Sequence, residues 1–225
     1  MTSGERVRVK LCGMTRAADV AGAVEAGADY VGVIFAGGTR NLTPAMAQEV
    51  VAPAAGRVPV VGVFGAVEAR EIGTVARAVG LSAVQLHGDP SPALVTAVRS
   101  EFGGEVWAVR RLAQPALDEA VAALCAVADM VVLDAYAPHT LGGTGTPLDW
   151  PTLGRALAGR PERQQVVLAG GLRPTNVAAA IAAVRPAVVD VSSGIERAPG
   201  MKDHESMRAF VRAARSAVDA GERGR

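Results

Sequence analysis

The stretch VRVKLCGMTRAADVAGAVEAGADYVGVIF, residues 7–35, contains the unit on which the fold is built. The apolar runs at 7–12 and 30–35 predict two strands, because each is short and rich in branched residues. The segment between them has the residue spacing of a helix, and Gly27 stands just beyond its expected end. The stretch therefore predicts a strand, a helix and a second strand in succession.

This alternation continues toward the end of the chain. Pro44 and Pro174 mark the first turns of two later helices, while Gly80 and Gly159 follow the expected ends of others. Several apolar runs are nearly continuous in Val, Leu and Ile, as strands covered on both faces should be. We expect eight strands, at residues 7–12, 30–35, 58–64, 83–87, 105–110, 130–134, 165–169 and 188–192.

Eight strand–helix units in 225 residues predict an α/β fold, a single (β/α)8 barrel in which helices surround a closed parallel sheet. An open doubly wound sheet is the alternative, but it rarely needs eight such regular units. No linker or change in composition divides the chain, so we expect one domain over residues 1–225. The polar tail, at about 219–225, is expected to fray.

The composition excludes several classes of function. Half of the residues are hydrophobic and the net charge is +1, so we expect neither nucleic acid nor a membrane as a partner. Residues 1–9 lack the apolar segment of a signal peptide, and no uncharged apolar stretch approaches the ~18 residues that span a membrane. Cys12 and Cys125 fit no disulfide or metal pattern, which favours a reducing compartment. We expect a cytoplasmic globular monomer without a metal site.

The active site of such a barrel lies at the carboxyl ends of its strands, so polar residues there are candidates. Cys12 ends the first strand, Arg40 follows the second, Gln85 and His87 end the fourth, and Asp134 ends the sixth. The thiol and the carboxyl could act as base and acid if positive surroundings lowered the first pKa and burial raised the second. On the residues alone, packing and helix capping stay open as the alternatives.

The last two expected strands end in glycines and hydroxyls, Gly170-Gly171 and Ser192-Ser193-Gly194. Each end precedes a helix, so backbone N–H groups and hydroxyls there can converge on an anion. Loops after the seventh and eighth strands are a recurrent phosphate position in these barrels. These five residues therefore predict a phosphate site, although glycines that only serve tight turns remain the alternative.

Seven stretches, in order and at compatible spacing, carry a resemblance to a known family. They are KLCGMT (10–15), GADYVGVIF (27–35), VGVF (61–64), VQLHG (84–88), VVLDAYAPHTLGGTGTPLDW (131–150), LAGGLRPTNV (168–177) and VDVSSGIERAPGMKD (189–203). Together they resemble phosphoribosylanthranilate isomerase, of tryptophan and hence aromatic amino-acid biosynthesis.

The resemblance implies a cofactor-free Amadori rearrangement, in which the small-molecule substrate N-(5-phosphoribosyl)anthranilate becomes 1-(2-carboxyphenylamino)-1-deoxyribulose 5-phosphate. The family's general base on the first strand corresponds to Cys12, and its general acid on the sixth strand corresponds to Asp134. The family's arginine that faces the anthranilate carboxylate corresponds to Arg40. The chain departs from the family around it, because GTRN (38–41) replaces an SPR-type tripeptide followed by an aromatic residue.

Other polar residues are interpreted by their place in the sequence. Gln85 and His87 belong to the family's QLHG segment, and either substrate contact or structural hydrogen bonding fits them. Asp190 lies inside a strand and is interpreted as a satisfied polar group of the barrel, and Cys125 as a core residue. His139 and His204 are interpreted as loop or surface residues. Four further residues are interpreted as anchors of helix starts, namely Asp149, Trp150, Lys202 and Asp203.

Two other functions stay open at this point. A sugar-phosphate isomerase of histidine biosynthesis, or a bifunctional relative, performs the same chemistry on the same type of barrel. Those relatives resemble one another in an aspartate at the position of Cys12, so the thiol favours the dedicated tryptophan enzyme. A non-catalytic paralogue that only binds a phosphate is the third possibility. The presence together of Cys12, Asp134 and Arg40 speaks against it.

Overall fold

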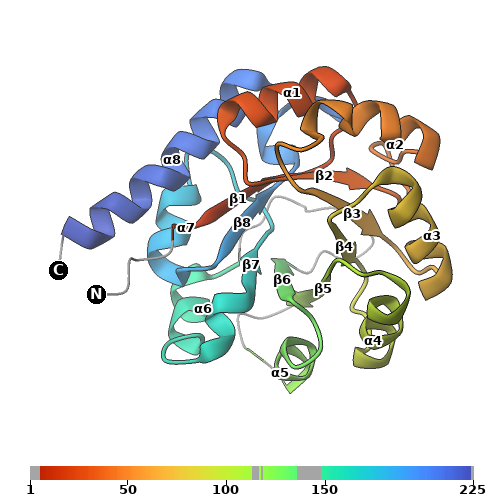
Figure 1. The fold of residues 1–225 in the computed structure, drawn as a ribbon. Helices are drawn as coiled ribbons and strands as arrows, with labels where there is room; N and C mark the ends of the chain where they lie inside the picture. The colour runs from red at the N-terminus through yellow and green to blue at the C-terminus, as the bar shows by residue number, and fades with distance from the viewer. Residues whose placement is uncertain (1–5, 113–116, 118, 136–147, 224–225) are drawn as a thin grey trace.

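The computed structural model describes residues 6–112, 117, 119–135 and 148–223. Its eight parallel strands close into a barrel, in which each strand pairs with the next and the eighth pairs with the first (Figure 1). The strands are β1 (Arg8–Leu11), β2 (Tyr30–Ile34), β3 (Val60–Phe64), β4 (Ala83–Leu86), β5 (Glu105–Leu112), β6 (Met130–Ala135), β7 (Val166–Leu168) and β8 (Val188–Val191). The expected (β/α)8 barrel is confirmed, and each strand overlaps its expected range.

A ring of helices surrounds the barrel (Figure 1). They are α1 (Ala17–Ala26), α2 (Pro44–Val51), α3 (Ala69–Val79), α4 (Pro92–Glu101), α5 (Glu119–Cys125), α6 (Trp150–Ala156), α7 (Val177–Val184) and α8 (His204–Arg223). Helix α2 begins with a capped first turn, because the side chain of Thr43 accepts a hydrogen bond from the N–H of Met46. Gly27 and Gly80 cap α1 and α3 with φ of 83° and 74°, a backbone region that glycine favours.

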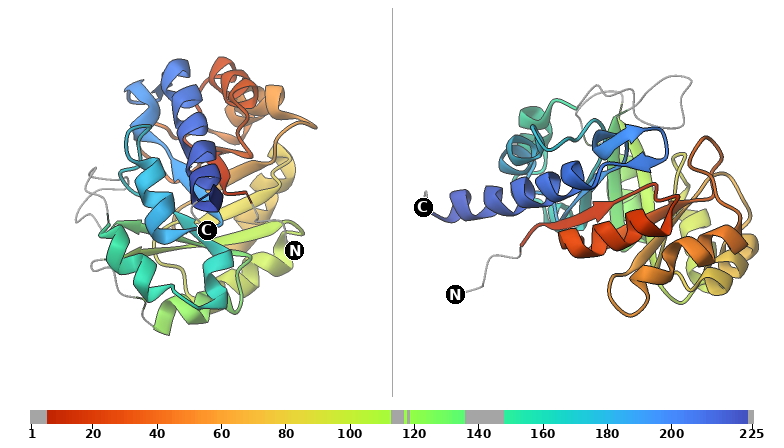
Figure 2. Two further views of the ribbon diagram at one scale, coloured as in Figure 1. Left: turned by 90° about the vertical axis from the view of Figure 1, so that its left-hand side faces the viewer. Right: turned by 90° about the horizontal axis from the view of Figure 1, so that it is seen from above.

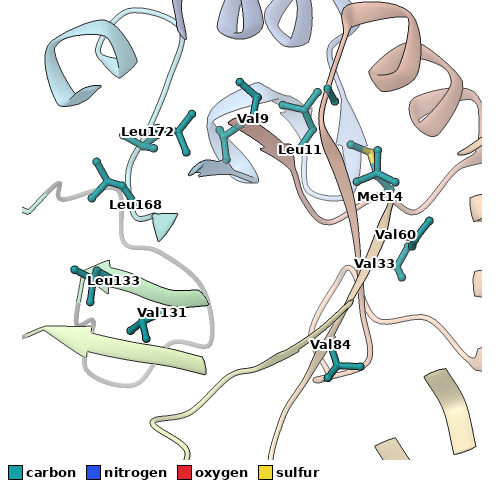
Figure 3. Packing of buried hydrophobic residues seen from close by; sticks show 14 of the residues in the cluster. Val9, Leu11, Met14, Val33, Val60, Val84, Val131, Leu133, Leu168 and Leu172 are labelled. Carbon is teal, nitrogen blue, oxygen red and sulfur yellow. The ribbon is translucent and has the colours of Figure 1, made fainter. Parts of the chain in front are cut away.

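Side-chain alternation along the strands separates the core into two layers. Val131 and Leu133 on β6 belong to the larger cluster, which packs the barrel against its helices (Figure 3). Met130 and Val132 of the same strand belong to a second cluster inside the barrel, around the fully buried Trp107. Both faces of the strands are thus covered, which explains their nearly continuous apolar sequence.

The chain adds a short structure between β8 and α8 that was not expected from the sequence. A turn of 3-10 helix, η3 (Ser193–Ile195), leads into an antiparallel hairpin of β9 (Glu196–Ala198) and β10 (Met201–Lys202). Two further 3-10 turns, η1 (Ala52–Ala54) and η2 (Pro161–Gln165), precede β3 and β7. Both η3 and the hairpin directly follow a strand end where the phosphate site is expected.

Helix α8 closes the described part of the chain, and its last turns extend beyond the barrel (Figure 2). Its backbone is helical to Arg223, so residues 219–223 continue the helix where a frayed tail was expected, and 224–225 lie outside the described residues. No helix among the described residues is both long and apolar enough to cross a membrane.

Candidate active site

A cavity of about 440 Å³ opens at the carboxyl ends of the strands. It is lined by all ten site residues predicted from the sequence, namely Cys12, Arg40, Gln85, His87, Asp134, Gly170, Gly171, Ser192, Ser193 and Gly194. Alternation along the strands brings several of them together, because Val9 and Leu11 of β1 face the helices and leave the next residue, Cys12, facing inward.

A buried polar network lies beside this cavity. The ammonium group of Lys10 on β1 is fully buried and donates to Asp190 Oδ2 (2.8 Å) and to Gln85 Oε1 (3.0 Å). Asp190 therefore is only partly satisfied, contrary to the sequence interpretation, because its Oδ1 is buried without a hydrogen-bond partner in the described residues. The carbonyl of Gln85 serves Lys10, which is the structural role left open for it. Lys10 itself was not identified from the sequence.

Cys12 is a free, buried thiol close to two buried ammonium groups. Burial raises the pKa of this thiol, Lys10 and Lys202 lower it, and Asp190 raises it further. The result is a pKa above its usual value, so the expected lowering by positive surroundings is present but is outweighed by desolvation. The protonated thiol is therefore the resting form at neutral pH.

Asp134 has the raised pKa that a general acid needs. Burial, and after it the charge of Asp190, raises the pKa of this carboxyl to about 6. A backbone N–H and the charges of Arg111 and Lys10 lower the pKa, but by less. Its Oδ1 is buried and accepts no hydrogen bond from the described residues. Gly170 makes room for it, since a Cβ there would lie 2.7 Å from Oδ1. This oxygen is free to exchange a proton with a molecule in the cavity.

Arg40 reaches the cavity, but it is already engaged by a carboxylate that sequence reasoning missed. Its Nε and Nη2 donate to Glu196 Oε1 (2.8 Å) and Oε2 (2.6 Å). Lys202 Nζ donates to the same Glu196 (2.8 Å) and to the carbonyl of Ser192 (3.0 Å). The interpretation of Lys202 as a helix anchor is wrong, because its ammonium group lies beside the site. Asp203 does anchor a helix, since it accepts the N–H groups that open α8.

The predicted phosphate end of the cavity combines a turn of two glycines with positive φ and an unpaired hydroxyl of Ser192. Gly170 and Gly171 have φ of 87° and 66°, which orients successive peptide groups as ordinary residues rarely can. Ser192 Oγ is buried and has no hydrogen-bond partner among the described residues. An unpaired buried hydroxyl is costly unless a ligand completes it, so this end of the cavity suits an anion with several oxygen acceptors.

The three histidines differ in their surroundings. His87 faces the cavity, and burial together with Arg111 lowers its pKa, so that its imidazole is neutral at pH 7. His204, expected at the surface, is partly exposed but holds Asp19 through Nε2 (2.9 Å). The prediction for His139 lies outside the described residues.

Two further interpretations concern helices. Asp149 caps α6, as expected, by accepting the N–H of Thr152. Cys125 is half-buried at the end of α5 and packs against the core, as expected.

A closed barrel whose strand ends line a cavity with a buried thiol and a carboxyl of raised pKa, with two buried lysines beside it, defines a (β/α)8-barrel enzyme site. The family described as N-(5'-phosphoribosyl)anthranilate (PRA) isomerase matches residues 9–213. The chain belongs to this family, whose isomerase activity serves tryptophan biosynthesis.

Individual relatives agree with the family match. An N-(5'-phosphoribosyl)anthranilate isomerase of Afipia carboxidovorans is 41% identical, over 93% of this chain and 89% of the relative. The crystal structure of the Thermus thermophilus isomerase is similar with a TM-score of 0.81 at 31% identity, over 93% of this chain and 99% of that one. A further isomerase structure, in complex with reduced 1-(o-carboxyphenylamino)-1-deoxyribulose 5-phosphate, has a TM-score of 0.76 at 33% identity and covers 93% and 99%.

Proposed function

We propose that this protein converts N-(5-phosphoribosyl)anthranilate to 1-(2-carboxyphenylamino)-1-deoxyribulose 5-phosphate, with Cys12 as general base and Asp134 as general acid. The observation that carries the proposal is that both groups line one cavity, the carboxyl having its pKa raised to about 6 and an oxygen with no partner in the described residues. Family membership supplies the substrate, since relatives bear the name of this activity.

The chemistry divides into two proton transfers. Asp134 gives its proton to the furanose ring oxygen, and the ring opens as the C1–O bond breaks and a protonated Schiff base forms. The thiolate of Cys12 then removes the proton on C2, and its bonding electrons neutralise the iminium as an enolamine. The enolamine tautomerises to the ketone, so the rearrangement moves hydrogen within the substrate and needs no cofactor.

The first step requires a protonated carboxyl and the second requires a thiolate, so at the start of the reaction the pair must hold one proton, on Asp134. Because burial raises the pKa of Cys12 above that of Asp134, the proton rests mainly on sulfur in the empty site. The competent arrangement is the minor one, with the proton on the carboxyl. Lys10 and Lys202 favour it, since their charges stabilise the thiolate.

The remaining site residues bind the two anionic ends of the substrate. Arg40 binds the anthranilate carboxylate, because its planar guanidinium can donate two parallel hydrogen bonds. Gly170, Gly171, Ser193 and Gly194 offer backbone N–H groups to the phosphate, and Ser192 adds its unpaired hydroxyl. Neutral His87 can donate one hydrogen bond to the substrate. A cytoplasmic monomer remains the predicted form.

The first test compares the isomerase rate of the wild type with Cys12→Ala and Asp134→Asn, on substrate generated in situ. Each variant should lose about 10²-fold or more while its circular dichroism spectrum stays native. Cys125→Ala is the matched control for removing a thiol and should keep full activity. A wild-type protein that binds the reduced product analogue but does not convert the substrate would instead be a non-catalytic paralogue that only binds a phosphate.

A second assay separates the related isomerase functions. Wild-type protein should be inactive on the aminoimidazole substrate of histidine biosynthesis, because those relatives resemble one another in an aspartate where this chain has Cys12. Turnover of both substrates would establish a bifunctional enzyme.

A further inference from the structure

The β9–β10 hairpin brings two charged side chains to the edge of the cavity. Glu196 and Lys202 are opposite each other across the two strands, and their side chains are 5% and 0% exposed. The Lys202 ammonium donates to Glu196, and among the described residues the hydrogen bonds to this carboxylate come from Arg40 and Lys202, not from Cys12 or Asp134. Glu196 is thus a buried acid that the mechanism does not use.

The contact between Glu196 and Arg40 fixes the direction of the guanidinium. Two nitrogens of Arg40, Nε and Nη2, meet the two oxygens of Glu196 in a parallel pair of hydrogen bonds at 2.8 and 2.6 Å. This arrangement occupies one edge of the planar group and leaves the Nη1–Nη2 edge for another acceptor. The Arg40 stem lies against Gly13, where a Cβ would come within 2.8 Å of its Cδ. The absence of a side chain at Gly13 thus leaves the room that the Arg40 stem occupies.

The hairpin is itself held to α1. Asp19, whose side chain is fully buried, accepts from the backbone N–H of Lys202 (3.3 Å), from two nitrogens of Arg16 (2.8 and 2.7 Å) and from His204 (2.9 Å). Thr15 donates to the carbonyl of Gly200 at the hairpin turn. Several independent contacts thus fix the backbone that carries Glu196.

The charges of this cluster leave it attractive to an anion. Burial alone would raise the pKa of Glu196, but hydrogen bonds from Arg40 and Lys202 outweigh it and hold that pKa below its usual value. Glu196 is therefore a carboxylate at neutral pH. One negative and two positive charges leave a net charge of one positive unit at the edge of the cavity. Glu196 directs Arg40 without cancelling its attraction for a substrate carboxylate.

We propose that Glu196 is a positioning residue, which holds Arg40 so that the free edge of its guanidinium meets the anthranilate carboxylate. This inference rests on the proposed function, in which Arg40 binds that carboxylate. It predicts a specific pattern, because misaligned Arg40 weakens binding of the carboxylate while the proton transfers at Cys12 and Asp134 proceed as before.

The test measures binding of two ligands by calorimetry. One is the reduced 1-(o-carboxyphenylamino)-1-deoxyribulose 5-phosphate, and the other is the same molecule without its ring carboxyl group. Glu196→Gln should weaken binding of the first about tenfold and of the second less than about twofold. In kinetics the same variant should raise KM by a similar factor and leave kcat within about threefold of the wild type.

Further variants separate the possible failures. Asp129→Asn removes a carboxylate that also binds an arginine, at the other end of the barrel, and should change neither Kd. Arg40→Lys keeps the charge but loses the paired contact, and should repeat the selective loss if Glu196→Gln does not fold.

The outcomes that would overturn the proposal are distinct. Equal weakening of both ligands by Glu196→Gln, or none, would overturn the positioning role while Arg40→Met still discriminated between the ligands. An Arg40→Met variant that did not discriminate between them would overturn the role of Arg40 in the proposed function, and the inference with it.

Discussion

Asp29 and Asp129 lie at the amino ends of β2 and β6, whereas Asp134 and Asp190 lie at or near the carboxyl ends of β6 and β8. The amino-end pair uses one repeated arrangement, in which each aspartate exchanges two hydrogen bonds with a residue of the preceding strand. The backbone N–H of Asp29 donates to the Val9 carbonyl (2.9 Å), and the Asp29 carboxylate accepts the Val9 N–H (2.7 Å). Asp129 forms the same two hydrogen bonds with a residue of β5, the strand that precedes β6.

Arginines complete the carboxylates at the amino end. Arg6 and Arg215 both approach Asp29 to 2.6 Å, and Arg99 approaches Asp129 to 2.8 Å. At the carboxyl end, Asp134 and Asp190 each keep one buried oxygen without a partner in the described residues. Burying such an oxygen destabilises the fold unless a ligand supplies its hydrogen bond. Aspartates at the amino end of the barrel are thus paired with arginines and contribute to stability, whereas those at the carboxyl end keep an oxygen that can interact with a substrate.

Activity gives the largest expected contrast between the ends. Asp134→Asn and Asp129→Asn are the same chemical change at opposite ends of β6. The first should lower kcat/KM by about 10²-fold or more, because a general acid is lost. The second should leave kcat/KM within about twofold, since Asp129 does not line the cavity. Steady-state rates at equal protein concentration measure both values of kcat/KM. Comparable losses of kcat/KM in the two variants would contradict a catalytic role that is specific to Asp134.

The pH dependence of kcat/KM should show which carboxylate controls the site. Below the Asp134 pKa of about 6, both members of the pair with Cys12 are protonated and no thiolate is available, so the rate should fall about tenfold per pH unit. Above the raised pKa of Cys12 both protons are lost, no acid remains, and the rate should fall again.

A variant must separate this acid limb from the substrate, whose phosphate also titrates near pH 6. The residual activity of Asp134→Asn should lose the limb near pH 6. A limb that persisted unchanged in this variant would belong to the substrate or to another group. Asp129→Asn, in contrast, should keep the wild-type profile throughout.

The alternation of strands and helices made much of this predictable. Short Val-rich runs separated by helices leave few folds other than the closed barrel, and strand ends then define the cavity residues. The parity that turns Cys12 inward also turns Lys10 inward, two residues earlier on β1. That signal was present in the sequence, but a lysine in an alternating strand is ordinarily a solvent-facing residue.

Other features could not be predicted in the same way. The β9–β10 hairpin has strands of three and two residues, too short for any periodic pattern, so the role of Glu196 and Lys202 was hidden. The net pKa of Cys12 depends on a balance between burial and two nearby ammonium groups. Residue types alone indicate the opposing effects, but only the packed structure decides which one is larger.

Stability should respond in opposite directions at the two ends. Asp29→Asn should lower the free energy of unfolding by about 2–3 kcal/mol, because a neutral amide cannot hold two arginines and a strand N–H together. Asp129→Asn should cost less, about 1 kcal/mol, since its carboxylate is more exposed and binds one arginine. Urea unfolding at pH 7.5 measures both. Negligible changes in the free energy of unfolding for both variants would show that these hydrogen bonds and ion pairs do not stabilise the fold.

An effect smaller than that of Asp29→Asn, and opposite in sign, is a gain of stability from Asp134→Asn at neutral pH, by about 1–2 kcal/mol. The folded pKa of Asp134, about 6, lies above its usual 3.8. A raised carboxyl pKa means that the folded state loses stability as pH rises through that window, because the native carboxylate is poorly solvated. A shift of this size corresponds to at most ~3 kcal/mol, and desolvation of the new amide reduces the gain.

The size of this effect depends on pH, which makes it a sharp test. Below pH 3.8 the carboxyl is protonated in both folded and unfolded chains, so the advantage of Asp134→Asn should vanish there. Between 3.8 and about 6 the advantage should grow, and above that range it should stay constant. Urea unfolding at pH 5 and pH 7.5 follows the trend. A variant less stable than the wild type at pH 7.5 would show that favourable contacts stabilise the Asp134 carboxylate. The aspartates at the two ends of the barrel would then not differ in this respect.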